Sequence, residues 1–193
     1  MKTKQKLGIV SALLVGLVIT GKAQAQSTPS STPAPKEWRI SVGPEFGVPI
    51  GQFSNAYNWN FGGSVQVDIP IVEKLYVTVN AGYNDFFAKK AFSDLGGSDF
   101  KLVPVKAGVK YFVLGNLGYV QGEGGFSFLT NKSDLNADKS GAVTFAPQIG
   151  VLLPLAKKNY LDVGFRWEQT ATFYDGGNSS NFLGLRVAYS FGL

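Results

Sequence analysis

The chain of 193 residues contains no cysteine and no histidine. Without cysteine, no disulfide can hold the fold, and lipid attachment to an N-terminal cysteine is excluded. Without histidine, the chain lacks the usual general base and the commonest metal ligand. A serine with a lysine could still form a nucleophile and its base, but no spacing singles out such a pair. We therefore expect no catalytic residue, no cofactor and no metal site, and a protein that is not an enzyme.

One loop resembles a metal site in its spacing alone. Asp134, Asn136 and Asp138 follow the D-x-N-x-D order of oxygen ligands in calcium loops. In such loops the sixth position is glycine and the twelfth is glutamate, whereas here they are Lys139 and Phe145. We interpret this segment as a solvated polar loop.

The N-terminus is typical of an export signal. Lysines at positions 2, 4 and 6 precede an apolar run over residues 7–20, and Ala23-Gln24-Ala25 has the small-x-small pattern of a signal-peptidase site. The run is shorter than the roughly 20 residues of a membrane-spanning helix, which disfavours the alternative of an uncleaved anchor. We predict a cleaved signal peptide over residues 1–25 and a mature chain that begins at Gln26.

Removal of this signal changes the charge balance of the chain. It takes away Lys2, Lys4, Lys6 and Lys22, so the 18 basic residues fall to 14 against 13 acidic ones. A nearly neutral mature chain lacks the basic surface that nucleic-acid binding needs, so we expect no nucleic-acid partner. Proline and serine dominate residues 26–37, which predicts a flexible linker before one domain over residues 38–193.

Period-two alternation of apolar and polar residues recurs throughout this domain, and no stretch of it has helical periodicity. The clearest blocks are residues 75–84, 161–168 and 183–193, and looser ones lie at about 38–48, 59–69, 102–113, 117–128 and 142–153. Strands of this kind are long enough to cross a bilayer when tilted. Pro44, Pro104 and Pro147 each lack a backbone donor, so we expect local bulges and a possible register slip there.

The connections between the blocks alternate in length. The long ones are residues 49–58, 86–100, 129–141 and 169–181, and the short ones are residues 70–74, 114–116 and 154–159. This order is typical of outer-membrane barrels with periplasmic termini and extracellular long loops. The predicted fold class is all-β: an eight-stranded antiparallel up-and-down transmembrane β-barrel, preceded by the cleaved signal peptide and the short linker.

Charge and bulk indicate which face of the strands meets lipid, because a soluble barrel also alternates but places its apolar face inside. The polar phase carries the charged residues and many glycines, which suits the narrow interior of an eight-stranded barrel. The apolar phase carries bulky residues such as Phe46, Phe126 and Trp167, which we assign to lipid. The predicted interior charges are five bases and five acids: Arg39, Glu45, Asp68, Lys106, Lys110, Glu123, Asp162, Arg166, Glu168 and Arg186.

We expect these charges to form a structural ion cluster, since an unpaired buried charge is costly. Glu123 lies beside the predicted strand that holds Lys106 and Lys110. Arg186 can meet Glu45 across the seam between the last and first strands. A selective proton or ion path through the same residues is the alternative.

Aromatic residues gather near both ends of the predicted strands, as the interfacial girdles of membrane barrels do. The expected interfacial residues are Trp38, Tyr111, Tyr160, Tyr189 and Phe191 at the periplasmic end and Trp59, Tyr83 and Trp167 at the other end. The alternative is that aromatic residues simply favour strands.

Three stretches carry a resemblance to a known group: residues 47–53 (GVPIGQF), 103–112 (VPVKAGVKYF) and 188–193 (AYSFGL). In them the chain resembles the small outer-membrane β-barrel proteins of the OmpA/OmpX type. The resemblance implies the cell outer membrane of a Gram-negative bacterium, contact with outer-membrane lipid and lipopolysaccharide, insertion by the barrel-assembly machinery, and a monomer.

None of these stretches is specific to one function. We expect a structural or surface-interaction role, with an unidentified extracellular ligand at the long loops, because loops on a rigid scaffold commonly carry function. A narrow channel or transport component of the outer membrane is the alternative.

Overall fold

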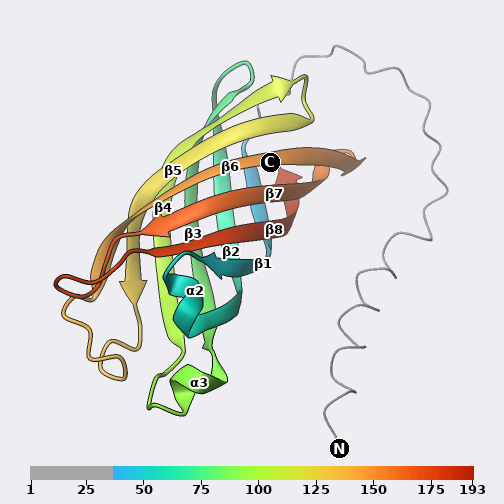
Figure 1. Ribbon diagram of the computed structural model, residues 1–193. Coiled ribbons are helices and arrows are strands. Elements are labelled where there is room, and N and C mark those ends of the chain that lie inside the picture. The colour runs from blue at the N-terminus through green and yellow to red at the C-terminus, as the bar shows by residue number, and fades with distance from the viewer. Residues whose placement is uncertain (1–36) are drawn as a thin grey trace, which may run out of the picture. The chain divides into compact units, whose positions relative to one another are not determined.

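A computed structural model describes residues 37–193 of the chain, which form eight strands and two single-turn helices (Figure 1). The elements are β1 (Arg39–Ile50), α2 (Phe53–Ala56), β2 (Tyr57–Val72), β3 (Leu75–Ala88), α3 (Lys90–Ser93), β4 (Phe100–Leu114), β5 (Gly118–Leu129), β6 (Gly141–Ala156), β7 (Asn159–Thr170) and β8 (Ser180–Gly192). Each strand pairs antiparallel with the next, and β8 pairs with β1, so the sheet closes into a barrel. The predicted fold class is confirmed for this part of the chain.

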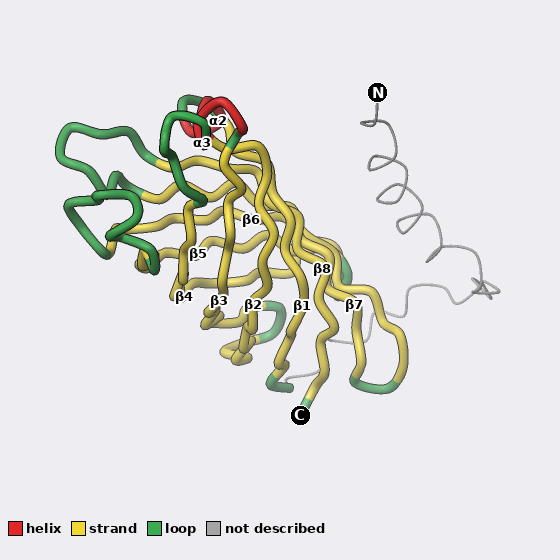
Figure 2. The backbone as a smooth tube through the Cα atoms, turned by 90° about the horizontal axis from the view of Figure 1, so that it is seen from below, coloured by secondary structure: helices red, strands yellow, loops and turns green. Residues whose placement is uncertain are grey.

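The connections have the expected alternation of length. Short turns at residues 73–74, 115–117 and 157–158 lie at one end of the barrel, which we call the turn end. Longer connections, with α2 and α3 among them, lie at the opposite end, which we call the loop end (Figure 2). No helix within residues 37–193 is long and apolar enough to cross a membrane. The predicted signal peptide over residues 1–25 and nearly all of the predicted linker lie outside the described residues.

The alternation in sequence becomes an alternation of burial. In β3, Thr78 and Asn80 are fully buried in the interior, whereas the neighbouring Val79 is 45% exposed on the outside. Phe126 and Phe165 are likewise exposed on the exterior. Successive side chains of a strand point to opposite faces, so one strand can present hydrocarbon outside and polar groups inside. The barrel is therefore apolar outside and polar inside, the reverse of a soluble barrel.

Strand pairing is interrupted near each of the three prolines, but the register of the strands does not change there. The pairing of β1 with β8 has a gap around Pro44, that of β3 with β4 around Pro104, and that of β6 with β7 around Pro147. The register is the same before and after each gap, and each proline still has a partner on its other neighbouring strand. The expected bulges and register slip at these positions are wrong, because the missing donor affects one side of the strand only.

The register does shift next to the short turns. The shifts lie between Pro70 and Val72, Phe112 and Leu114, and Pro154 and Ala156, with one more between Tyr57 and Trp59 near the loop end. Each short turn also holds one residue in the left-handed region, at Lys74 (φ 67°), Gly115 (φ 58°) and Lys158 (φ 61°). Lys74 and Lys158 are each the second residue of a two-residue turn, whereas Gly115 is the first residue of a three-residue turn. Of these three positions, only the last has glycine, for which the left-handed conformation is least strained.

Candidate functional site in the barrel interior

The interior holds a network of ion pairs that begins at Lys106 on β4. Its Nζ atom lies 2.5 Å from Oε2 of Glu168 on β7, across the lumen. Glu123 on the neighbouring strand β5 is farther, with its Oε2 atom 3.9 Å from the same nitrogen. All three side chains are almost completely buried. The lysine therefore pairs mainly across the barrel, and its expected pairing with Glu123 is the weaker of the two.

Two arginines extend the network: Arg166 contacts Glu168, and Arg186 joins through Glu45. Arg166 Nε lies 3.2 Å from Glu168 Oε2, and its terminal nitrogens donate to both carboxylate oxygens of Glu45 on β1. Arg186 on β8 approaches the same carboxylate, with its Nε atom 3.6 Å from Glu45 Oε1. The structure thus brings Arg186 to Glu45 at the seam between β8 and β1, and a forked pair with Arg166 makes this junction geometrically specific.

The network continues to the turn end through Asp162. Arg186 Nη1 lies 3.4 Å from Asp162 Oδ2, and Lys110 Nζ lies 3.3 Å from the same oxygen. Lys110 also pairs with Asp68 Oδ2 at 2.7 Å. Nine of the ten predicted interior charges therefore belong to one continuous chain of contacts that links six strands. Lys110 pairs with two aspartates rather than with Glu123, which differs from the expectation for that lysine.

Neutral side chains complete the hydrogen bonding of the carboxylates. Ser64 Oγ donates to Glu45, Gln66 Nε2 to Asp68, Thr78 Oγ1 to Glu123 and Tyr119 Oη to Asp162, at 2.5–2.9 Å. Sequence reasoning did not single out these four residues. The sequence did contain one indication: each of these residues lies on the polar, inward-facing side of its strand, as the interior charges do. A buried charge needs such additional donors, since its partner ion alone does not replace hydration.

The tenth charge, Arg39, lies outside the ion network, in an aromatic layer at the turn end. Its guanidinium carbon lies 4.4 Å from the ring centre of Tyr76, 5.3 Å from that of Phe112 and 5.5 Å from that of Tyr160. Within residues 37–193 no acidic group forms an ion pair with Arg39, and its Nε and Nη1 atoms have no hydrogen-bond partner there. Its Nη2 atom donates to the Tyr76 hydroxyl oxygen at 2.5 Å, so this hydrogen bond and the cation–π contacts together hold the charge.

A second aromatic layer fills the loop end of the interior. Its buried members are Phe53, Tyr57, Phe86, Phe100, Leu102, Leu129, Ala137, Ala142, Phe173 and Phe182. Phe173 belongs to the connection between β7 and β8, yet it is buried against Phe100, with ring centres 5.6 Å apart. Part of a long loop thus folds back into the mouth of the barrel. This layer and that around Arg39 lie on the two sides of the ion network.

Seven of the eight aromatic residues expected at the lipid interfaces have exposed or half-buried side chains on the barrel exterior. Trp38, Trp59, Tyr83, Tyr111 and Tyr189 are between 41% and 50% exposed, and Trp167 and Phe191 are half-buried. Tyr160 differs, because it packs against the turn-end layer and donates its hydroxyl hydrogen to Glu37 Oε1 at 3.0 Å. It shares the strand phase of the interior residue Asp162, so its assignment to the lipid interface is wrong.

Two of the long loops are joined to each other. Lys139 Nζ lies 2.9 Å from Asp175 Oδ1, and the backbone amide of Asp175 donates to Asp138 Oδ2 at 2.7 Å. The Tyr174 hydroxyl donates to the carbonyl of Leu135 at 3.0 Å. The backbone amides of Asp138 and Lys139 also donate to the carbonyl of Phe173, at 3.1 and 3.0 Å, so side-chain and backbone contacts together join the two loops. The described residues contain no group of three or more potential ligand side chains arranged to hold a metal ion.

These features define a class of protein. A closed antiparallel barrel of eight strands, apolar outside and filled inside by paired charges, has the architecture of the small outer-membrane β-barrels.

Comparison with solved structures shows the same fold. The chain is similar to outer membrane protein AlkL in DMPC lipid bilayers, with TM-score 0.54, 16% identity, and coverage of 87% of this chain and 95% of that one. It is also similar to outer membrane protein OprG from Pseudomonas aeruginosa, with TM-score 0.53, 11% identity, and coverage of 84% and 98%. Neisserial surface protein A matches with TM-score 0.51, 14% identity, and coverage of 81% and 96%. No protein-family model and no curated protein matches the sequence.

Proposed function

We propose that this chain is a non-enzymatic integral protein of the outer membrane, with a closed lumen and a structural or surface-interaction role. The main observation in support of a closed lumen is the continuous ion network that fills the interior between two aromatic layers. An eight-stranded barrel has an interior just wide enough for side chains to fill. The proposed activity therefore belongs to the outer surface and the long loops, and not to the lumen.

The exterior supports location in a membrane. Residues such as Val65, Val109 and Ile149 are 48–60% exposed on the barrel wall. Within the described strands, the charged residues on these outward faces are Asp85 and Lys101, which lie next to each other near the loop end, with 3.8 Å between Lys101 Nζ and Asp85 Oδ2. In water this much apolar surface would promote association, whereas in hydrocarbon it is the stable solution. Closure of the sheet also leaves no unpaired strand edge, which a bilayer requires.

The proposed orientation follows from the lengths of the connections. Short turns and both termini would face the periplasm, and long loops would face the cell exterior, as in other bacterial barrels. The proposal includes a monomer, insertion by the barrel-assembly machinery, contact of the loop end with lipopolysaccharide, and an extracellular ligand bound at the long loops.

A narrow path for water or ions is the second candidate. Glu168 Oε1, Asn80 Oδ1 and Ser127 Oγ are buried and have no hydrogen-bond partner among the described residues. Buried polar atoms of this kind are commonly satisfied by water, so a hydrated line along the network would fit them.

Single-channel recording in planar bilayers separates the two candidates. The unmutated, refolded protein is expected to give no resolved conductance steps. The double variant Arg166→Ser/Glu168→Ser removes two large interior side chains and should give a measurable leak, which serves as the positive control. Large and stable steps from the unmutated protein would contradict a closed lumen and make the channel the better proposal.

A further inference from the structure

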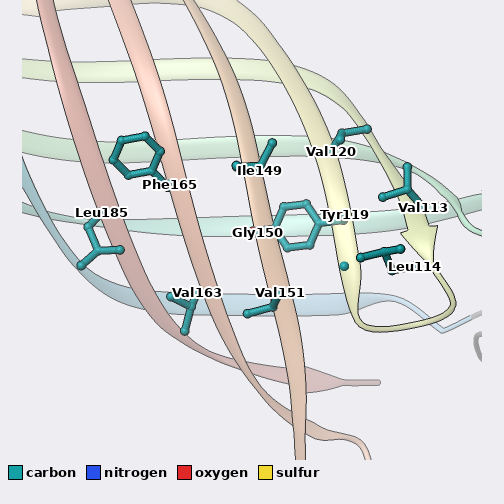
Figure 3. Close-up of a pocket in the computed structure, with 11 residues that line it drawn as sticks. Val113, Leu114, Tyr119, Val120, Ile149, Gly150, Val151, Val163, Phe165 and Leu185 are labelled. Carbon is teal, nitrogen blue, oxygen red and sulfur yellow. The ribbon is translucent and has the colours of Figure 1, made fainter. Parts of the chain in front are cut away.

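The barrel wall has an apolar groove on its outer surface, over the turn-end half of β4 to β8. The groove is open to the outside and has a volume of about 410 Å³. Its lining includes the outward side chains of Val120, Ile149, Val151, Val163, Phe165 and Leu185 (Figure 3). Figure 3 shows Ile149, Val151 and Val163 in the middle, between Val120 on one side and the pair Phe165 and Leu185 on the other. A hollow on a lipid-facing wall can receive a chain that a smooth wall cannot hold in place.

A continuous apolar track joins this groove to the turn between β6 and β7. Along β6, the outward residues after Val151 are Leu153 and Leu155, which are 41% and 57% exposed. The strand then ends at Ala156, and the turn consists of Lys157 and Lys158. Both lysines are exposed, and no ion pair joins either of them to an acidic group within residues 37–193.

The length of this track matches one lipid leaflet. Val151 and Lys157 are six positions apart, which is about 20 Å of strand at roughly 3.3 Å per residue. With the strand tilted by about 40°, the track descends about 15 Å along the bilayer normal, half of a hydrocarbon core of roughly 30 Å. An acyl chain in the groove would therefore have its headgroup at the lysines.

The charge of the turn complements an anionic headgroup. Lys157 and Lys158 make up the whole of the β6–β7 turn, and both are exposed. A phosphate at this end of the apolar track would therefore meet two cations at the level of the lipid headgroups.

We propose that the β6–β7 hairpin is a docking site for an anionic glycerophospholipid. Its acyl chain lies along Leu155 and Leu153 into the groove, and its phosphate is bound by Lys157 and Lys158. This inference rests on the proposed location in a membrane, and it assigns the site to the leaflet at the turn end.

The turn between β2 and β3 supplies a matched control. Lys74 has the same left-handed backbone as Lys158, with φ 67°, but it follows Glu73 and so belongs to a neutral turn. The substitutions Lys158→Gly and Lys74→Gly are therefore equivalent for the backbone, and both favour the turn conformation. Only the first, combined with Lys157→Gln, removes the charge at the end of the apolar track.

The experiment measures lipid retained by the full mature protein after refolding into vesicles of phosphatidylethanolamine with a minor fraction of phosphatidylglycerol. Native mass spectrometry of the released complexes counts each lipid. The unmutated protein should be enriched in phosphatidylglycerol over the vesicle composition. Each lysine near a headgroup contributes about a fivefold preference, so Lys157→Gln/Lys158→Gly should lose enrichment by more than tenfold. Lys74→Gly should keep it.

Three outcomes would overturn the proposal: unchanged enrichment in the double variant, an equal loss in Lys74→Gly, or displacement of the lipid by millimolar glycerol phosphate. The last result would show a headgroup site without a role for the groove. Heat-dependent gel migration of every protein is recorded first. If the unmutated protein does not insert as a barrel, the proposed function itself fails, whereas an inserted barrel without enrichment removes only the lipid site.

Discussion

Lys106 and Glu168 meet across the lumen, with Nζ 2.5 Å from Oε2, although 62 positions separate them in the chain. The neighbouring strand offers no equally good partner, because the register places Lys106 opposite Gly125 and sets Glu123 opposite Gly108. A glycine directly across the ladder leaves space for the lysine to extend into the interior. In a barrel this narrow, a long side chain then reaches a strand that is not its neighbour.

The two carboxylates near Lys106 should differ in their effect on stability. Glu168→Ala removes the close partner of Lys106 and a partner of Arg166, and it should lower the free energy of unfolding by about 3–5 kcal/mol. Glu123→Ala should cost clearly less, because Lys106 keeps Glu168. Urea titration of the refolded variants measures both values. An equal cost would mean that Lys106 does not prefer the carboxylate across the lumen.

The same substitution should have very different effects on stability at Arg39 and at Arg186. Arg186→Met breaks pairs with Glu45 and Asp162 and should destabilise the barrel by about 3–5 kcal/mol. Arg39→Met keeps an apolar side chain against the aromatic rings and removes a buried charge that has no ion pair among the described residues, although the hydrogen bond to Tyr76 is lost as well. It should therefore cost far less than Arg186→Met. The readout is the urea midpoint, and a large loss for Arg39→Met would reveal an ionic role for this residue.

Lipid and lumen faces can be distinguished by cysteine labelling, because the chain has no cysteine of its own. Val79→Cys is expected to lie in lipid and Asn80→Cys in the interior. A fluorophore at position 79 should be quenched by brominated acyl chains, whereas the filled interior should exclude the dye from the thiol at position 80 of the folded barrel. The charge effect is measured separately, since Val79→Arg should cost about 2–4 kcal/mol near mid-bilayer while the control Val79→Leu costs little. Equal quenching at both sites would contradict the assignment of faces.

The contact between the two long loops should depend on Asp138 and on pH. Asp138→Ala removes the acceptor for the Asp175 amide and should speed hydrogen exchange in residues 171–179 with little change in global stability. The hydrogen bond to Asp175 raises the pKa of Lys139 above its ordinary value. The lysine's contribution is therefore present below its ordinary pKa and is lost as the pH rises through the raised value. Exchange that is unaffected by Asp138→Ala would show that other contacts hold the loops together.

Export should remove residues 1–25. The protein extracted from membranes is expected to have the intact mass of a chain that begins at Gln26, because Ala23-Gln24-Ala25 fits the signal-peptidase pattern. Replacement of Ala25 by a bulky residue should slow cleavage and leave a larger precursor. A mass that includes residues 1–25 in the unmutated protein would favour an uncleaved anchor.

The sequence by itself determined the strands, their faces and the order of long and short connections, because these depend on local alternation that any antiparallel barrel preserves. It also shows that Tyr160 lies on the same strand face as Asp162, two positions away, which predicts that the ring points into the barrel. The sequence could not show that Lys106 meets Glu168 or that Arg39 leaves the ion network for aromatic rings. Those partners depend on strand register and on the width of the closed barrel, which bring together residues from strands that are not neighbours. Phe173 is another example, because it belongs to a long loop and only the folded structure shows that its ring is buried in the mouth of the barrel.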